Sequence, residues 1–303
     1  MSEINLSGLG VALITPFGED NSIDYAALSQ LVKFHLESAT DYIVALGTTA
    51  ESPTLSKQEK RSVIRFITEQ TNHKIPVIAG VGGNSTADVA EELETGDFTG
   101  VSAILSVTPS YNKPPQEGLY RHYRTLSHAS PLPLILYNVP GRTGVNMTAE
   151  TTLRLSRDCS NIIAVKEASG DLRQIKAIID GAPEGFSVIS GDDSITADVI
   201  ALGGTGVISV FANAFPREMA WLVRSALEGN ATEARRKMND DFGTLFRLMF
   251  EEGNPAGVKC LLHLMGMIRN RLRLPLVPVS EKTLREIETE LVRLTREKPV
   301  QGG

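Results

Sequence analysis

Residues 162–190 read IIAVKEASGDLRQIKAIIDGAPEGFSVIS and contain a complete strand–helix–strand pattern. The first five residues form an aliphatic run that ends at Lys166, as is typical of a strand buried on both faces. The segment 172–180 has apolar side chains at helical spacing, and a second β-branched run follows at 187–190. Such a unit predicts a parallel sheet with helices packed against it.

The same alternation recurs through the first 230 residues. Strands are expected near residues 10–15, 42–46, 76–79, 101–107, 133–137, 162–166, 187–190 and 207–210. Helices are expected near residues 25–38, 57–71, 87–95, 117–129, 149–156, 172–180, 195–202 and 217–228. At the second of these helices, Ser56 and Glu59 have the spacing of a capping box. Eight strand–helix pairs predict an α/β fold, a (β/α)8 TIM barrel over residues 1–230.

From residue 231 onward the strand signal stops. The apolar residues now recur at helical spacing, and a charged helix is expected after residue 280. Residues 231–303 are therefore predicted to form a C-terminal helical subdomain packed on the barrel.

Composition excludes several classes of protein. The 303 residues carry a net charge of -6, which does not supply the positive field that nucleic-acid binding needs. No apolar run reaches the roughly 18 residues of a membrane span, and the N-terminus lacks a signal-peptide pattern, so a cytoplasmic location is predicted. Cys159 and Cys260 lie far apart, and no histidine pair has ligand spacing, so no disulfide, metal or other cofactor is predicted.

Active sites of (β/α)8 barrels lie at the C-terminal ends of the strands. Polar residues at the predicted strand ends are therefore the best candidates for catalysis. They are Thr15, Thr48, Thr49, Tyr111, Tyr137, Asn138, Lys166, Gly191, Asp192 and Asp193.

Lys166 ends the sixth predicted strand. Alternation places it on one face with Ile162 and Ala164, while Glu167 points the other way. If Lys166 faces the barrel interior, loss of water favours its neutral amine, which can attack a carbonyl carbon. A lysine paired with a structural carboxylate is the more common alternative, so the neighbouring residues must decide.

Three features of the neighbouring strand ends favour chemistry. The phenol of Tyr137, on the adjacent strand, can move protons during imine formation. The hydroxyls and backbone N–H groups of Thr48 and Thr49 can hold a small carboxylate, and Arg142 offers a planar fork suited to another. Each has a structural explanation when taken alone, as a core tyrosine, turn threonines and a surface arginine. Together with Lys166 they predict an enzyme that forms a Schiff base with a small keto acid.

Six segments carry a resemblance that covers nearly the whole chain. They are Gly47–Ser52, Thr108–Asn112, Tyr137–Gly144, Val165–Ala168, Ser190–Asp193 and Gly206–Val210. The chain resembles the dihydrodipicolinate synthase family of pyruvate-dependent class I aldolases, a superfamily that includes N-acetylneuraminate lyase. The resemblance implies a homotetramer made of two tight dimers and no cofactor.

The resemblance also implies roles for individual residues. Lys166 would condense with pyruvate, with Tyr137 as the proton donor. Thr48 and Tyr111, the latter reaching into a neighbouring subunit, would complete a proton relay. The residues that contact the substrates would be Thr49, Ile208, Gly191 and Arg142. Arg142 would hold the carboxylate of L-aspartate 4-semialdehyde, the second substrate of a condensation on the diaminopimelate route to lysine.

A possible allosteric lysine pocket of the family is matched in part. The corresponding residues are Ser52, Lys57, Asn84 and Asp88. Ser110 replaces a tyrosine, and Lys57 and Lys60 stand where many lysine-inhibited members have histidine. Two cations would oppose a bound lysine ammonium, so weak or no inhibition by lysine is predicted. Ala50 replaces a glycine of the family, a small change unless the backbone needs a positive φ there.

Two other functions stay open at this stage, and a metal-dependent aldolase is a more distant third. One is a pyruvate aldolase acting on a sugar aldehyde, because the N-acetylneuraminate lyase branch is similar around Lys166 and Tyr137 but lacks an arginine at position 142. The other is a barrel that has lost catalysis and serves as an interaction scaffold. The intact set of Lys166, Tyr137, Thr48 and Tyr111 counts against a scaffold.

Overall fold

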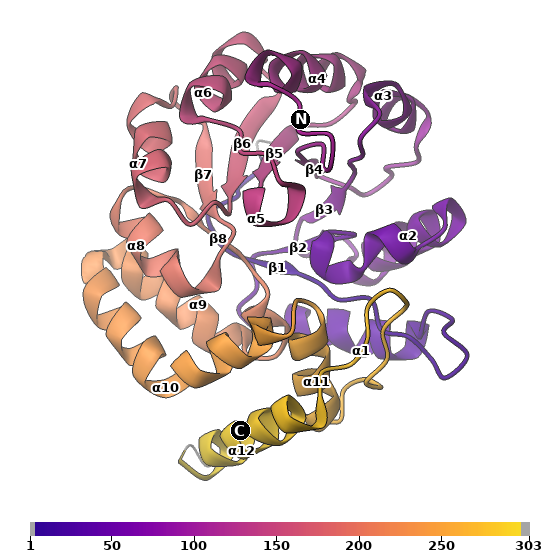
Figure 1. Ribbon diagram of the computed structural model, residues 1–303, viewed down its shortest axis with the longest axis vertical. Helices are drawn as coiled ribbons and strands as arrows, with labels where there is room; N and C mark the ends of the chain where they lie inside the picture. Colours follow the sequence, from indigo (N-terminus) through magenta and orange to yellow (C-terminus); the bar gives the residue numbers. More distant parts are fainter. Residues whose placement is uncertain (1–3, 298–303) are drawn as a thin grey trace.

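The computed structural model describes residues 4–297, with side chains through residue 295 (Figure 1). Eight parallel strands pair in sequence order, and the last pairs with the first to close a barrel. Helices surround this barrel on its outside, as Figure 1 shows. The predicted (β/α)8 fold is confirmed.

Every end of the eight strands lies within three residues of its predicted position. They are β1 Gly8–Ala12, β2 Tyr42–Ala45, β3 Val77–Gly80, β4 Ala103–Val107, β5 Leu134–Asn138, β6 Ile162–Glu167, β7 Ser187–Ser190 and β8 Gly206–Ser209. The first strand starts and ends earlier than the predicted range 10–15. Its apolar run continues past the ladder, where the N–H of Ile14 donates to the Asn213 side chain (3.1 Å) instead of a strand.

The helices of the barrel follow the predicted alternation. They are α1 Tyr25–Leu36, α2 Lys57–Thr71, α3 Thr86–Thr95, α4 Gln116–Ala129, α5 Pro140–Thr143, α6 Ala149–Asp158, α7 Leu172–Gly181, α8 Thr196–Ala201 and α9 Pro216–Ser225. The capping box of Ser56 and Glu59 is present at the start of α2. The sequence did not predict α5, because four residues are too few to show helical periodicity.

Two apolar clusters pack on the two faces of the barrel wall. The inner cluster takes residues from all eight strands, and the outer one lies between strands and helices. Ala164 belongs to the inner cluster but Ile162 belongs to the outer one, because β6 carries one extra residue relative to β5 near Leu134. The prediction that Ile162 shares a face with Lys166 is therefore wrong, while the pairing of Lys166 with Ala164 stands.

The segment after residue 230 is helical, as predicted. Its helices are α10 Ala231–Glu251, α11 Ala256–Leu264 and α12 Glu281–Glu297. Helix α10 packs on α8 and α9, and α11 and α12 pack on α10 (Figure 1). The chain runs from α9 into α10 through a bend at Gly229 (φ 93°), and the division into two domains at residue 230 stays a prediction. Over residues 4–297, no helix combines the length and apolar character that crossing a membrane requires.

Gly80 ends β3 against the backbone that leads out of β2. A Cβ atom at position 80 would lie 2.3 Å from the carbonyl oxygen of Leu46. We expect Gly80→Ala to lower the free energy of unfolding by about 1–3 kcal/mol, because backbone atoms must shift to admit the methyl group. Gly243→Ala in α10 is the control, since no heavy atom lies within 4 Å of a Cβ there. Equal urea midpoints for the two variants would contradict this packing.

Candidate active site

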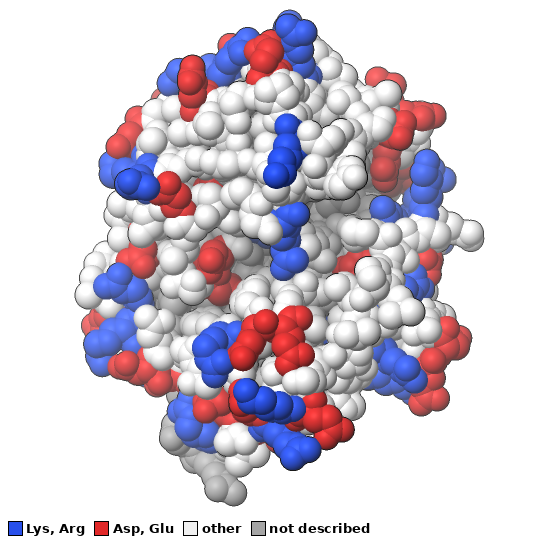
Figure 2. Space-filling view, viewed as in Figure 1, with Lys and Arg blue, Asp and Glu red and all other residues white. Residues whose placement is uncertain are grey.

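Two cavities meet at the C-terminal mouth of the barrel. The larger, of about 690 Å³, lies over β5, β6 and β7 and is walled on one side by α10. The smaller, of about 420 Å³, lies over β2, β3 and β4. Tyr137, Val139 and Arg142 line both cavities and form the boundary between them. Figure 2 shows a hollow near the centre of this face, with Lys and Arg side chains beside it and charges of both signs around the edge.

Lys166 lies in the larger cavity and is only 5% exposed. It is the register partner of Tyr137 on β5, and its Nζ lies 4.4 Å from the centre of the Tyr137 ring. Over residues 4–295, no carboxylate lies within ion-pair distance of Lys166. The structural ion pair that the sequence left open is therefore absent in this part of the chain, and the amine faces the cavity beside a phenol.

Gly191 leaves room for the Lys166 side chain. A Cβ at position 191 would lie 3.1 Å from Lys166 Cε and 2.6 Å from the Ala168 Cβ. Gly191 also lines the larger cavity, and its N–H donates to the carbonyl of Glu167 (2.8 Å). A glycine here keeps the path from the amine to the cavity open.

Glu167 points to the outer face of the barrel, as alternation predicted. Its fully buried carboxylate accepts hydrogen bonds from Asn138, from Gln174 and from the N–H of Ser169. Burial raises the pKa of Glu167, and these hydrogen bonds oppose that rise. The Asn138 amide oxygen in turn accepts from the N–H of Met147 (3.0 Å), which fixes the far end of the loop that carries Arg142.

Thr48 and Thr49 lie in a single 3₁₀ turn after β2. Thr48 lines the smaller cavity and Thr49 the larger, so the pair lies at both parts of the site. Thr49 is buried, and its hydroxyl oxygen accepts a hydrogen bond from the Asn254 side chain (2.9 Å). The structure thus brings both threonines to the cavities that also contain Lys166 and Tyr137.

Two predicted substrate contacts differ in their placement. Arg142 lies in α5 and lines both cavities with an exposed side chain. Ile208 is 1% exposed within the inner apolar cluster and lines neither cavity. The structure places Arg142 at the mouth and Ile208 beneath it.

Tyr111 lies apart from the other candidate catalytic residues. Its side chain is 90% exposed, its backbone is left-handed (φ 74°), and it lines neither cavity. Its N–H donates to the carbonyl of Thr143 (3.2 Å), which holds the backbone, and its phenol is exposed to solvent.

Only two of the four candidate regulatory residues line a cavity. Ser52 and Asn84 line the smaller cavity, whereas Lys57 and Asp88 are exposed and do not. The Asn84 side-chain oxygen accepts hydrogen bonds from the N–H (2.9 Å) and hydroxyl (3.1 Å) of Ser110.

Three buried charged residues lie near the site; the sequence placed Asp193 at a strand end without assigning it a role, and Glu51 and Lys259 were missed. Asp193 lines the larger cavity and accepts from the N–H groups of Val210 and Phe211, and burial raises its pKa to about 6. Glu51 and Lys259 form an ion pair with no exposed side-chain surface. Lys259 interrupts the apolar helix that begins at Ala256, and a cation in such a run was the available signal.

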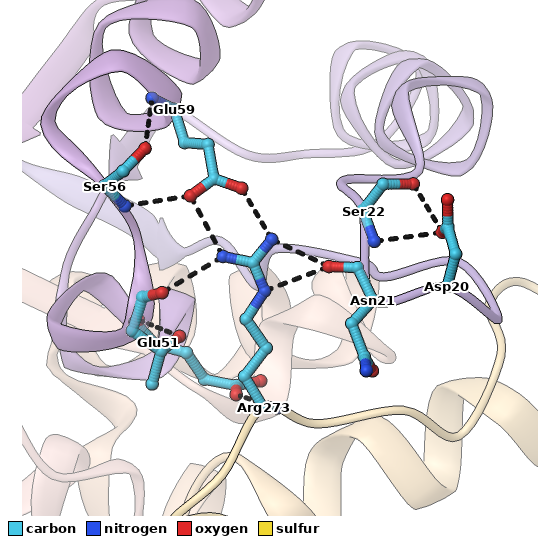
Figure 3. A network of polar contacts seen from close by, with 8 residues as sticks. Asp20, Asn21, Ser22, Glu51, Ser56, Glu59 and Arg273 are labelled. Atoms are coloured by element: carbon cyan, nitrogen blue, oxygen red, sulfur yellow. Dashed lines mark hydrogen bonds and ion pairs between the residues drawn. The ribbon is translucent and has the colours of Figure 1, made fainter.

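Arg273 ties the C-terminal segment to the loop and helix that follow β2. Figure 3 shows its guanidinium between the Glu59 carboxylate and the backbone carbonyl of Asn21. The same group donates to the carbonyl of Thr54 (3.0 Å).

Within residues 4–295, no set of three or more His, Cys, Asp or Glu side chains is grouped as a metal ion would require.

The closed barrel and its cavity, with a buried lysine at the strand ends, define a (β/α)8-barrel enzyme. The chain belongs to the dihydrodipicolinate synthetase family, whose model matches residues 5–294. It is 54% identical to the 4-hydroxy-tetrahydrodipicolinate synthase of Parabacteroides distasonis, covering 97% of this chain and 99% of that protein.

Solved structures agree with this assignment. The chloride-inhibited dihydrodipicolinate synthase of Acinetobacter baumannii, in complex with pyruvate, is 41% identical, with a TM-score of 0.91 and coverage of 96% of this chain and 99% of that one. A monomeric dihydrodipicolinate synthase variant is 40% identical, with a TM-score of 0.91 and coverage of 95% and 96%.

The ion pair of Arg273 with Glu59 predicts a pH-dependent contribution to stability. The Arg273 hydrogen bonds lower the pKa of Glu59 from 4.5 to about 2. A lowered carboxyl pKa stabilises the fold above about pH 4.5, and this stabilisation is lost as the pH falls toward 2. Arg273→Met should therefore lower the free energy of unfolding by about 1–2 kcal/mol at pH 7, since the pair is partly screened by solvent.

Urea unfolding at several pH values tests this expectation. The deficit of Arg273→Met relative to the wild type should shrink between pH 5 and pH 3. Arg285→Met, which removes an exposed helical pair with Glu281, is the control and should have little effect at any pH. A deficit of Arg273→Met that does not change with pH would contradict the assignment.

Proposed function

We propose that the protein is a 4-hydroxy-tetrahydrodipicolinate synthase, a lyase that condenses pyruvate with L-aspartate 4-semialdehyde through a Schiff base on Lys166. The observation that carries the proposal is the buried Lys166 amine, free of any carboxylate partner over residues 4–295 and next to the Tyr137 phenol. The name and the 54% identity of the Parabacteroides relative, and the pyruvate complex of the Acinetobacter structure, support it.

The first step joins Lys166 to pyruvate. The neutral Nζ attacks the C2 carbonyl carbon to form a carbinolamine, and the C2 oxygen leaves as water once it has been protonated. Tyr137 is placed to donate that proton, because its ring lies against Nζ and its hydroxyl makes no hydrogen bond within residues 4–295. The product is an imine between Lys166 and C2.

The second step forms the carbon–carbon bond. Loss of a proton from the pyruvate methyl group converts the imine to an enamine, whose carbon attacks the aldehyde carbon of the second substrate. The aldehyde oxygen takes up a proton and becomes the hydroxyl group of the product. Attack of the second substrate's amine on C2 then closes the ring and releases Lys166.

Substrate binding follows from the placement of the polar groups. Thr48 and Thr49 are assigned the pyruvate carboxylate, because their turn lies at both cavities and presents hydroxyl and N–H donors. Gly191 lines the wall of the larger cavity and is assigned to the pyruvate pocket, whereas Ile208 is assigned to it by the resemblance alone, because it lies buried in the inner apolar cluster. Arg142 at the boundary of the cavities binds the carboxylate of the semialdehyde.

Tyr111 completes the proposed proton relay from a second copy of the chain. The support for this is its 90% exposure, which leaves the phenol free to contact another subunit. On this basis, and by the family resemblance, we propose a homotetramer of two tight dimers. One of the related structures is a monomeric variant, so the oligomeric state of this protein should be measured directly. A cytoplasmic location and a lysine pocket at Ser52, Lys57, Asn84 and Asp88 stay predictions.

Borohydride trapping tests the reaction. Incubation with pyruvate and borohydride should add one reduced pyruvate to the protein, and peptide mass spectrometry should locate it on Lys166. The adduct should be absent from Lys166→Met. Turnover without any adduct on Lys166 would contradict the mechanism.

Substitution of Arg142 tests the second substrate. Arg142→Ala should lower kcat/KM for aspartate semialdehyde by about 100-fold or more, since a charge-assisted hydrogen bond is worth about 1.5–3 kcal/mol and the fork can form two. Arg173→Ala, at a 94% exposed arginine outside both cavities, is the control. If the wild type turned over N-acetylmannosamine in preference to the semialdehyde, the sugar-aldolase alternative would replace this assignment.

A further inference from the structure

The carboxylate of Glu51 lies only two residues beyond Thr49 and is fully buried. One of its oxygens contacts the Lys259 ammonium, and the other accepts from the N–H of Arg273 (3.0 Å). The side chains of Glu51 and Lys259 both have 0% exposure, and neither residue lines either cavity. Their effect on the reaction must therefore pass through the turn that carries Thr48 and Thr49.

The Lys259 side chain is itself held from several sides. Its ammonium also donates to the carbonyl of Arg271 (3.0 Å) and lies 4.2 Å from the centre of the Phe17 ring. The Arg273 guanidinium lies 4.5 Å from the same ring, so Phe17 packs against both cations. Burial lowers the pKa of Lys259 to about 8, and the Glu51 carboxylate opposes that shift by favouring the ammonium.

The turn after β2 needs support from outside. Leu46 (φ 57°) and Glu51 (φ 56°) flank it, and both adopt left-handed backbone that non-glycine residues rarely occupy. The 3₁₀ turn between them has only three residues, too few to fix its own conformation. A left-handed backbone at a non-glycine residue is kept only where surrounding contacts hold it in place. Here the C-terminal segment supplies such contacts, from Asn254, Lys259 and Arg273.

The same segment also holds the Thr49 hydroxyl. Asn254 lies five positions before Lys259 and donates its side-chain amide to Thr49 Oγ1 (2.9 Å). The hydroxyl oxygen is thereby used as an acceptor, which leaves its proton free to be donated toward the cavity. Residues 254–259 therefore contact the turn twice, once at Thr49 and once at Glu51.

We propose that Lys259 is a positioning residue for the reaction: through the buried carboxylate of Glu51 it fixes the turn that presents Thr48 and Thr49 to pyruvate. The inference rests on the proposed function, because pyruvate is the ligand whose binding it would govern. It also gives the C-terminal helices a role at the active site. Figure 3 shows the neighbouring contacts of Arg273, whose backbone N–H donates to Glu51 and whose guanidinium donates to Glu59.

The test uses three variants of the full chain, each assayed below its unfolding temperature. Lys259→Met leaves the Glu51 carboxylate buried without a cation. Glu51→Gln/Lys259→Met removes both charges, so no unpaired charge remains in the interior. Arg269→Met is the matched control, because Arg269 also lies in the C-terminal segment but pairs with Asp24 outside the turn (3.1 Å).

The expected results separate positioning from stability. Lys259→Met should lower Tm, lower kcat/KM for pyruvate by about 10-fold or more, and raise the pyruvate concentration for half-maximal borohydride trapping at Lys166. The double variant should recover much of the Tm while its kcat/KM stays low. Arg269→Met should keep the kinetic constants of the wild type.

Two outcomes would overturn the inference: wild-type kcat/KM in folded Lys259→Met, or recovery of kcat/KM together with Tm in the double variant. If Lys259→Met does not fold, the double variant decides alone. Trapping of wild-type Lys166 separates the two proposals. A wild type that forms no adduct refutes the proposed function, whereas normal trapping with unaffected variants refutes only the positioning role.

Discussion

The site depends on keeping an amine out of water without pairing it to a carboxylate. The Lys166 amine lies beside the Tyr137 ring in the larger cavity, and over residues 4–295 no carboxylate lies within ion-pair distance of it. The barrel achieves this at Lys166 by turning Glu167, the adjacent acid, to the opposite face of β6, where Asn138, Gln174 and Ser169 hold its carboxylate. The alternation of a β-strand thus separates an acid and a base that are neighbours in sequence.

The C-terminal helices contact the cavity and the turn at the mouth of the barrel. Helix α10 walls the larger cavity, and residues 254–259 reach the turn after β2. Breaking a buried ion pair by removing one partner costs about 3–5 kcal/mol. The contact of Glu51 with Lys259 therefore couples the packing of these helices to the conformation of the turn. A barrel without them would keep Lys166 and Tyr137 but lose the support for Thr48 and Thr49.

The sequence predicted the fold, and it identified most of the candidate residues that line the cavities, because those features are local. Strand and helix periodicity identified the barrel, and strand ends identified Lys166, Tyr137 and the two threonines. The extra residue in β6 was missed, since a bulge depends on the register with β5 and not on the sequence of one strand. The pair of Glu51 with Lys259 joins residues 208 positions apart, and no spacing rule reports such a contact. Tyr111 was found at a strand end, but its proposed role in a neighbouring subunit came from the resemblance alone and stays a prediction.

A crystal structure of the protein after exposure to pyruvate would show directly whether Lys166 is the reacting group. We predict a covalent bond between Lys166 Nζ and C2 of pyruvate, with the carboxylate directed to the turn of Thr48 and Thr49. Pyruvate held in the cavity with an unmodified Lys166, or joined to another residue, would contradict it.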